Sequence, residues 1–428
     1  MNRYNEPGRE TWKALLQRPT QTLADIEGTV NDIFTEIRDG GDAIITSYTE
    51  KFDGVRLDRF QVPQVEIDRA GDRLSTDLKE AINRAKHHIT VFHSAQRTER
   101  VLVETAKGVS CWQEKRPIQK VGLYIPGGTA PLFSTILMLA VPATLAGCGE
   151  IVLCSPPDKN GNVDPAILYT AGLCGITQVF RVGGIQAIAG MTFGTESIPQ
   201  VYKIFGPGNQ FVTVAKQLAT KYGVAIDMPA GPSELLVMAD ESARADFVAS
   251  DLLSQAEHGT DSQVILVSTS AAFLDEVEKE LLVQLDKLPR KAIAEKAIAN
   301  SKLIYIKNAE TAIDLINEYG PEHYILCVAQ EEIYLDRLQN AGSVFIGNYT
   351  PESAGDYASG TNHTLPTNGY AKQYSGVNLD SFMKSMTFQR ISAVGIREIG
   401  ETIELMAEAE GLFAHKNAVT LRLNELKK

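Results

Sequence analysis

The stretch VGLYIPGGTAPLFSTILMLAVPATLAGCGEIVLCS, residues 121–155, sets the pattern for the long middle part of the chain. It holds two short apolar runs, 121–125 and 151–155, on either side of a longer apolar segment. Short runs of this kind that alternate with helical segments are typical of parallel β-sheets covered by helices. The stretch therefore predicts a strand, a glycine-containing loop, a helix and a second strand.

The same alternation continues through the rest of the middle of the chain. Eight more short apolar runs follow, most of them separated by helical stretches: 178–184, 201–206, 224–228, 234–239, 263–268, 302–306, 324–328 and 343–347. These strands outnumber those that one mononucleotide-binding half needs, and they lie on both sides of a natural hinge, Pro229-Ala230-Gly231-Pro232. The sequence therefore predicts an α/β fold with two Rossmann-like, mainly parallel sheet domains.

The two ends of the chain show helical spacing instead. Apolar residues from 22 to 52 recur every three or four positions, stop at Gly40-Gly41 and then resume, and a further helix is predicted over 78–96. Beyond residue 377 the chain is predicted to be helical, so we expect helical N-terminal and C-terminal extensions. The expected parts are an N-terminal helical segment at 1–20, a first α/β domain at 21–123 and 233–376, a second α/β domain at 124–232, and a C-terminal helical tail at 377–428.

Length and composition place the chain among globular proteins of two or more domains. It has 428 residues, of which 44% are hydrophobic, so it is too long for one ordinary core and apolar enough for several. A net charge of −12 and a pI near 5.2 argue against nucleic-acid binding, which normally requires a basic patch. We therefore expect no nucleic-acid partner.

Neither a membrane segment nor a disulfide framework is expected. The most apolar run, Leu132 to Ala146, is too short to span a bilayer and contains Pro142, and the N-terminal residues lack the apolar core of a signal peptide. The five cysteines are odd in number and form no CxxC pair, which fits a reducing compartment. We therefore expect a cytoplasmic protein without membrane contact.

Glycine-rich loops follow several of the predicted strands, where parallel sheets bind ligands. They are Pro126-Gly127-Gly128, Gly183-Gly184 and Gly206-Pro207-Gly208-Asn209. The last is nearest to a dinucleotide fingerprint, but Phe211 stands where the third glycine is required. This loop leaves two interpretations open, a phosphate or nucleotide site and a tight turn that begins an ordinary helix.

A long loop, GNYTPESAGDYASGTNHTLPT at residues 347–367, follows the apolar run Val344-Phe345-Ile346. Loops of this length inside compact domains are usually functional or disordered, and the tyrosines in this one argue against disorder. Asp356 and His363 are residue types that bind metals or move protons. They could equally close turns among the glycines, and the loop by itself leaves both interpretations open.

Two further pairs carry candidate chemistry. Gln255 and His258 are three residues apart, and so lie on one side of the last turn of a helix predicted over 243–258. Glu322 and His323 are adjacent just before a predicted strand. In an extended chain their side chains point to opposite faces, so both reach one ligand only if the backbone turns at Pro321.

Four segments together resemble the histidinol dehydrogenase family: SQAEHG (254–259), GPEHY (320–324), the 347–367 loop and AEGLFAHKNAV (409–419). The likeness extends over nearly the whole chain and includes IPGGTAPLFSTILMLAVPA, GPGN and MPAGPSE. That family oxidises L-histidinol through L-histidinaldehyde to L-histidine, with two NAD+ reduced, as the last step of histidine biosynthesis. The resemblance therefore implies an NAD-dependent, zinc-dependent alcohol oxidoreductase.

The resemblance also implies roles for individual residues. The zinc ligands, for one ion per subunit, fall on Gln255, His258, Asp356 and His415. The catalytic pair falls on Glu322 and His323. Contacts to NAD fall on Tyr124, Gln186 and Asn209. Contacts to the substrate fall on Ser233, Gln255, His258, Glu322, His323, Asp356, Glu410 and His415.

The implied mechanism assigns different work to the two catalytic residues. His323 is expected to act as general base in both oxidations, and Glu322 to activate the water that converts aldehyde to hydrate. Zinc is expected to hold the nitrogens of histidinol rather than activate its hydroxyl. The resemblance further implies a homodimer with shared sites, in which Glu410 and His415 come from the partner's tail.

Two other functions compete with this one. A thiol-dependent aldehyde dehydrogenase would need an activated cysteine, whereas Cys154 and Cys327 lie in apolar strands and Cys148 follows a helix, which favours buried structural roles. A non-catalytic, zinc-stabilised binding module would normally have thiolate ligands, and the implied ligand set has none.

Overall fold

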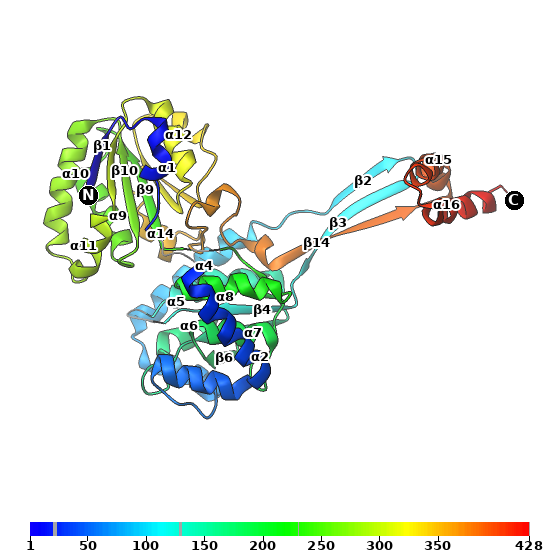
Figure 1. Cartoon of the computed structure of the whole chain (residues 1–428), viewed down its shortest axis with the longest axis horizontal. Helices are drawn as coiled ribbons and strands as arrows, with labels where there is room; N and C mark the ends of the chain where they lie inside the picture. The colour runs from blue at the N-terminus through cyan, green and yellow to red at the C-terminus, as the bar shows by residue number, and fades with distance from the viewer. Residues whose placement is uncertain (20–23, 128–130, 230, 428) are drawn as a thin grey trace. The chain divides into compact units, whose positions relative to one another are not determined.

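The ten strands predicted in the middle of the chain are all present, and they form two parallel sheets (Figure 1). The computed structural model describes residues 1–19, 24–127, 131–229 and 231–427. The chain divides into two compact units, 1–95 with 118–382 and 96–117 with 383–428. Both parallel sheets belong to the first unit.

One parallel sheet, sheet A, carries the strands that follow the predicted hinge. Its order is β1-β11-β10-β9-β12-β13. The strands are β1 (Asn2–Asn5), β9 (Glu234–Ala239), β10 (Gln263–Ser268), β11 (Lys302–Tyr305), β12 (His323–Cys327) and β13 (Ser343–Ile346). Strands β9 and β10 are buried at every residue because helices cover the sheet, which explains their continuous apolar runs. The helices of this region are α9 (Ala245–Ala256), α10 (Ala271–Leu285), α11 (Lys291–Ala299), α12 (Ala309–Tyr319), α13 (Glu331–Leu335) and α14 (Glu352–Tyr357).

The other parallel sheet, sheet B, has the order β6-β5-β4-β7-β8. Numbered along the chain, this order is 3-2-1-4-5, the order of the first five strands of a doubly wound dinucleotide-binding fold. The strands are β4 (Lys120–Tyr124), β5 (Glu150–Ser155), β6 (Gln178–Arg181), β7 (Lys203–Phe205) and β8 (Ala225–Ile226). Its helices are α5 (Phe133–Ala146), α6 (Pro165–Leu173), α7 (Gly184–Phe193) and α8 (Gln210–Lys221). The two predicted parallel sheets on either side of residues 229–232 are therefore confirmed.

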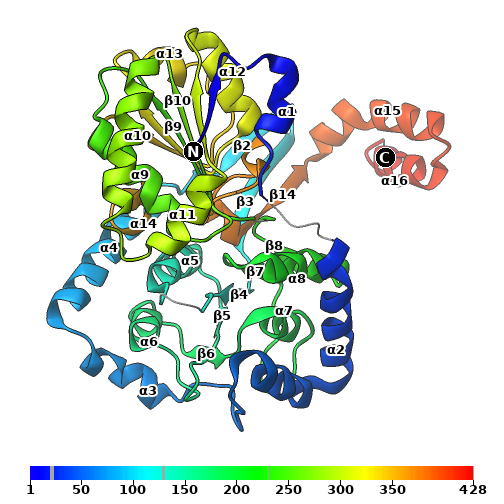
Figure 2. The same cartoon turned by 60° about the vertical axis from the view of Figure 1, so that its left-hand side comes forward.

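The helices between residues 24 and 94 pack against the sheet B region. They are α2 (Ala24–Asp53), α3 (Gln64–Arg69) and α4 (Thr76–Ser94). Helix α2 runs beside α7 and α8 (Figure 2), α3 packs on α6, and α4 packs on α5. The sequence prediction grouped residues 21–123 with 233–376, and the structure corrects this, because the apolar stripe of α2 joins the core of sheet B. The predicted break at Gly40-Gly41 is confirmed, since Gly41 has φ 55° and ψ −137°.

The second unit contains a three-stranded antiparallel sheet and two helices. The sheet has the order β14-β3-β2, with β2 at Val101–Ala106, β3 at Val109–Pro117 and β14 at Met383–Ile391. The helices are α15 (Ala393–Ala409) and α16 (Phe413–Glu425). The tail from residue 377 is therefore not wholly helical, because β14 pairs along its whole length with β3.

The N-terminal segment 1–20, predicted to be helical, likewise includes a strand. Helix α1 (Trp12–Leu15) is present, but residues 2–5 form β1, which pairs with β11. All four residues of β1 are exposed, so an apolar pattern could not reveal it. The short 3-10 helices are η1 (Arg9–Thr11), η2 (Ala70–Arg73), η3 (Tyr370–Lys372) and η4 (Leu379–Phe382). Among the described residues, no helix has both the length and the apolar character needed to cross a bilayer.

The aromatic pair Phe205 and Phe382 gives a test of the packing in the first unit. The rings stack with centroids 4.0 Å apart at 15°, and Phe382 is fully buried. We expect Phe382→Ala to lower the free energy of unfolding by about 3–5 kcal/mol, because it removes a buried ring and leaves a cavity. Urea unfolding followed by circular dichroism measures the change. Phe92→Ala is the control, since Phe92 is exposed, and an equal loss in both variants would contradict the assigned packing.

Candidate active site

Glu322 and His323 lie at the amino end of β12, beside the amino end of β9. His323 is the first residue of β12 and is in register with Leu235 of β9. The helix before them ends at Gly320, which has φ 59°, and Pro321 follows. Both side chains are buried, with 5% of Glu322 and 4% of His323 exposed. The predicted pair therefore occupies one buried site despite being adjacent in sequence.

The peptide groups of Glu234 hold both members of this pair. The Glu234 N–H donates to Glu322 Oε2 over 2.9 Å, and His323 Nδ1 lies 3.3 Å from the Glu234 carbonyl oxygen. A carbonyl oxygen only accepts hydrogen bonds, so Nδ1 carries the ring hydrogen. Nε2 of His323 then has a free lone pair, and it has no hydrogen-bond partner within the described part of the chain. This tautomer can accept a proton at Nε2.

The long 347–367 loop brings acidic groups to this imidazole. Asp356, on α14, has Oδ1 4.0 Å from His323 Nε2 and 3.7 Å from His363 Nδ1. Glu352, one turn earlier on α14, has Oε1 3.6 Å from His323 Nδ1 and is 1% exposed. His363 also lies with Nε2 3.2 Å from Thr135 Oγ1 on α5. The loop therefore packs its Asp356 and His363 beside His323 in the first unit.

Gln255 and His258 lie at the carboxyl end of α9, which packs against α14. Gln255 is fully buried, and neither of its amide atoms has a hydrogen-bond partner among the described residues. His258 is exposed, yet it is close enough for its charge to lower the pKa of His323 and of His363. Burying an amide without hydrogen-bond partners costs free energy, unless a bound ligand or metal ion supplies the missing partner.

The acidic groups of the site are held in an environment that favours their neutral forms. Burial raises the pKa of Glu322 and of Glu352 well above the usual range, and the charge of Asp356 raises both further. Burial also raises the pKa of Asp356 to about 7 and lowers the pKa of His323 to about 3. A bound divalent cation would reverse the effect on the carboxylates.

These residues fit a metal ion. One ligand atom each from His323, Glu352 and Asp356 lie within 4.8 Å of one another. Gln255, whose amide has no partner among the described residues, and His258 come from α9 and the residues just after it, and α9 packs against α14. With Asp356 they would supply oxygen and nitrogen donors and leave Nε2 of His323 free. Imidazole, carboxylate and amide donors without thiolates suit a divalent ion such as zinc in a site that keeps room for a substrate.

Glu352 is the residue of this site that sequence reasoning missed. It lies four residues before Asp356, and so one helical turn away on the same face of α14. That spacing is the signal that could have found it. The short helix within the long loop had to be recognised first, and the loop contains three glycines that argue against a helix.

Three further residues were assigned to the substrate, Ser233, Glu410 and His415, and they lie in different parts of the chain. Ser233 directly precedes Glu234, and its carbonyl oxygen accepts from the Gln263 N–H over 3.2 Å. Glu410 and His415 are exposed and belong to the second unit, at the end of α15 and on α16. Their roles toward the site stay predictions.

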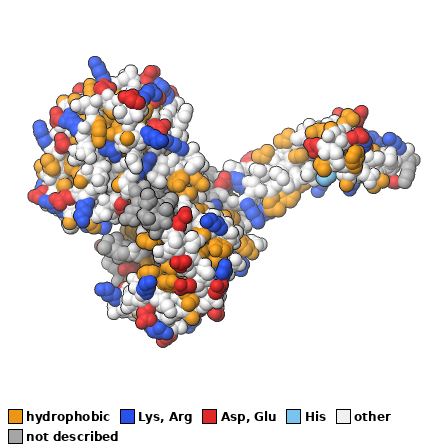
Figure 3. Space-filling view, in the orientation of Figure 1, with side chains coloured by type: hydrophobic (Ala, Val, Ile, Leu, Met, Phe, Trp, Pro, Cys, Tyr) orange, Lys and Arg blue, Asp and Glu red, His pale blue; other side chains and the backbone are white. Residues whose placement is uncertain are grey.

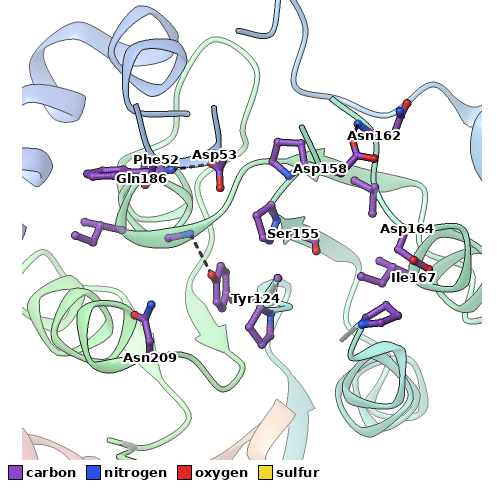
Figure 4. Close-up of a pocket in the computed structure, with 18 of the residues that line it drawn as sticks. Phe52, Asp53, Tyr124, Ser155, Asp158, Asn162, Asp164, Ile167, Gln186 and Asn209 are labelled. Atoms are coloured by element: carbon purple, nitrogen blue, oxygen red, sulfur yellow. Dashed lines mark hydrogen bonds between the residues drawn. The ribbon is translucent and has the colours of Figure 1, made fainter. Parts of the chain in front are cut away.

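A separate cavity of about 890 Å³ opens at the carboxyl ends of the sheet B strands. The three residues assigned to NAD all line it (Figure 4). Tyr124 Oη accepts from the Gly184 N–H at the start of α7 over 3.1 Å, and Asn209 Oδ1 accepts from the Val212 N–H over 3.1 Å. Asn209 is thus an ordinary helix N-cap and also lines the cavity, so the two interpretations of its loop are compatible.

Asp53, the last residue of α2, also lines this cavity, although no sequence pattern pointed to it. Gln186 Nε2 donates to Asp53 Oδ2 over 3.5 Å (Figure 4). Burial raises the pKa of Asp53 to about 6. The sequence prediction grouped α2 with the other sheet, so this contact between Asp53 and Gln186 was not foreseeable.

Cys148, Cys154 and Cys327 lie in surroundings that keep their thiols protonated. Cys154 is fully buried and Cys327 is 4% exposed, as predicted from their apolar strands. Burial raises the pKa of Cys327 to about 12 and that of the half-buried Cys148 to about 11, and it also raises the pKa of Cys154. A nucleophilic cysteine needs the opposite shift, so the thiol-dependent mechanism is disfavoured.

Comparisons with known proteins agree along the whole chain. The family model described as histidinol dehydrogenase matches residues 16–423. A histidinol dehydrogenase of Bacteroides thetaiotaomicron is 58% identical over 424 residues, which cover 98% of each chain. The crystal structure of histidinol dehydrogenase from Elizabethkingia anophelis has a TM-score of 0.98 and 54% identity, and the match covers 100% of this chain and 99% of that one. An acetylating aldehyde dehydrogenase from Geobacillus thermoglucosidasius, with 14% identity and a TM-score of 0.50 over 89% of this chain and 94% of that one, shares the fold alone.

Metal binding at the cluster should stabilise the protein. After chelation, zinc added at about one hundred times its Kd should stabilise the fold by about 2.7 kcal/mol, because only the folded state assembles the ligands. Differential scanning fluorimetry measures this as a rise in melting temperature. Asp356→Asn should lose most of the rise, whereas Asp39→Asn, an exposed control, should keep it. An undiminished rise in Asp356→Asn would exclude Asp356 as a ligand.

Proposed function

The chain belongs to the histidinol dehydrogenase family, and from this premise we propose that it oxidises L-histidinol through L-histidinaldehyde to L-histidine, with two NAD+ reduced. Family membership makes the protein an NAD-dependent oxidoreductase of the last step of histidine biosynthesis. The single observation that supports the detailed reaction is the buried His323, whose Nε2 is free to accept a proton beside a cluster of carboxylates. The five free cysteines support a reducing compartment, which we take to be the cytoplasm.

The two cofactors have separate places in this proposal. Gln255, His258 and Asp356 of one chain, with His415 of a second copy, would hold one zinc ion, which when bound fixes the substrate through its nitrogens. Tyr124, Gln186 and Asn209 line the cavity for NAD, which when bound accepts the hydride. Ser233, with Glu410 of the second copy, would contact the substrate.

His323 supplies the base in both oxidations. Its Nδ1–H is donated to the Glu234 carbonyl, so Nε2 takes the hydroxyl proton while the carbon gives up a hydride. Burial lowers the pKa of His323, which keeps the imidazole neutral before the reaction but weakens it as a base, so it needs a negative charge beside it when it takes the proton. The carboxyl groups of Glu322 and Glu352 each have an oxygen 3.6 Å from Nδ1, and the positive charge of the imidazolium favours their ionised forms, which stabilise it in return.

Glu322 acts between the two oxidations, when water adds to the aldehyde. Its carboxylate removes a proton from that water as the hydrate forms, and the hydrate is the substrate of the second hydride loss. Burial raises the pKa of Glu322, so it works as a base only while positive charge lies close to it. Protonated His323 and a metal ion both provide such a charge.

A homodimer is supported by the surface of the second unit. Its described residues include few buried hydrophobic side chains, and large apolar side chains lie exposed on its sheet and both helices (Figure 3). They include Val101, Leu102, Val103, Leu405, Met406, Phe413 and Leu421. A surface of this kind is normally covered by another chain. A second copy is the partner that would also deliver Glu410 and His415.

The two catalytic residues should fail differently when replaced. We expect His323→Asn to slow both oxidations by at least about a hundredfold, because both need the base. Glu322→Gln should slow aldehyde oxidation far more than alcohol oxidation, since only the second step uses activated water. Single-turnover NADH formation from histidinol and from histidinaldehyde separates the steps. The glutamine oxygen can still accept from the Glu234 N–H, so equal slowing of both steps would show that Glu322 has another role.

Shared sites predict that two inactive variants complement one another. Co-refolding His323→Asn with His415→Asn should restore about a quarter of all sites, because in a mixed dimer one site carries both defects and the other carries neither. NADH formation with histidinol measures the recovery. If each site were built from a single chain, every site would keep one defect.

The control for this experiment is the assembly state of each variant. Size-exclusion chromatography must show that His415→Asn still dimerises, since metal binding at a subunit junction could itself support assembly. A dimeric His415→Asn that gives no activity in the mixed refold would place His415 in the site of its own chain.

A further inference from the structure

Glu234 carries a buried ion pair in addition to its contacts with the catalytic residues. Arg18 donates from Nε to Glu234 Oε2 over 2.6 Å and from Nη2 to Oε1 over 2.9 Å. The side chains are 14% and 1% exposed. Two parallel hydrogen bonds between a guanidinium and a carboxylate fix the geometry of both groups as well as adding energy. The Glu234 side chain is therefore held in one orientation.

Tyr319, at the end of α12, completes this arrangement. Its hydroxyl lies 3.2 Å from Glu234 Oε2 and 3.1 Å from Gln263 Oε1, and its ring is fully buried. The Arg18 guanidinium lies 3.9 Å from the centre of that ring and donates to the Tyr319 carbonyl oxygen over 2.8 Å. Arg18 thus contacts both Glu234 and Tyr319. It lies more than two hundred residues before β9 and β12 in the sequence.

The same residue, Glu234, faces the catalytic pair with its main chain. Its N–H holds Glu322 and its carbonyl oxygen holds the Nδ1–H of His323. Glu234 is the first residue of β9, where the strand's regular hydrogen bonding begins, so its side-chain contacts add restraint to a peptide at the sheet margin. A shift of this peptide would move Glu322 and His323 together.

We propose that Arg18 is a positioning residue for the reaction, acting through Glu234 to hold Glu322 and His323 in their working orientation. The inference rests on the proposed function of that pair. Arg18 contacts neither member of the pair. A second ion pair, between Arg181 of sheet B and Glu66 of α3, has an arginine with the same 14% exposure, but its carboxylate is 41% exposed and has no such link. Displacements of about 1 Å at reacting groups can cost about a hundredfold in rate.

The test compares Arg18→Met with Arg18→Lys and with the control Arg181→Met. Arg181 is also 14% exposed and ion-paired, but its partner lies on α3. We expect Arg18→Met to lower kcat by about ten- to hundredfold, as is typical when the partner that orients a functional group is lost, with the KM for histidinol nearly unchanged. Arg18→Lys should recover part of kcat because the ammonium keeps one contact. Arg181→Met should keep both parameters.

The double variant Arg18→Met/Glu234→Gln guards against misfolding, since removal of Arg18 alone leaves a buried carboxylate unpaired. Circular dichroism and zinc content report whether it is folded and able to bind metal. The folded double variant should show the same loss of kcat. A wild-type kcat in folded Arg18→Met or in the folded double variant would overturn the proposal, and so would an equal loss of kcat in Arg181→Met.

His323→Asn, measured in parallel, separates this inference from the function on which it rests. If His323→Asn turns over histidinol normally, the proposed function fails. If His323→Asn is inactive while the folded Arg18 variants keep wild-type kcat, only the role of Arg18 fails.

Discussion

The hydrogen bond between His323 Nδ1 and the Glu234 carbonyl oxygen determines what chemistry the site can perform. It fixes the tautomer, so that the lone pair at Nε2 faces Asp356 and the space where a ligand would complete the site. Desolvation alone would lower the pKa of His323 strongly, and this hydrogen bond opposes the shift. A buried imidazole that is neutral, oriented and partly stabilised in its charged form is suited to accept a proton and return it.

The candidate sites lie at opposite ends of the strands in the two sheets. In sheet B the cavity lies where parallel sheets usually bind ligands, beyond the carboxyl ends, as Tyr124 and Asn209 show. In sheet A the residues proposed for acid–base chemistry, Glu322 and His323, lie at the amino ends of the strands, where β9 and β12 begin. The 347–367 loop makes this possible, because it leaves β13 and packs Glu352 beside His323. Glu352 and Asp356 therefore come to the amino ends of the strands from a loop that starts at the carboxyl end of β13.

The sequence predicted the strands well because a strand buried on both faces is mostly apolar, as the five residues that follow Glu234 in the fully buried β9 show. It missed β1 because an edge strand of exposed polar residues has no such pattern. The apolar stripe of α2 predicted that this helix packs against a sheet, but it did not identify which sheet. Asp53, which lines the sheet B cavity from the end of α2, was missed for that reason. Glu352 was missed because the sequence shows that a residue is acidic but does not show that the short helix α14 buries it.

The fold by itself leaves the chemistry undetermined, because this chain shares its architecture with an aldehyde dehydrogenase at low identity. Burial has opposite consequences for a thiol and an imidazole. It raises the pKa of Cys327, so the thiolate that covalent chemistry needs is hardly populated. It lowers the pKa of His323, so the neutral imidazole that proton transfer needs is fully populated. Burial therefore works against the thiolate that a thiol-dependent mechanism needs, and it keeps His323 in the neutral form from which the proposed mechanism starts.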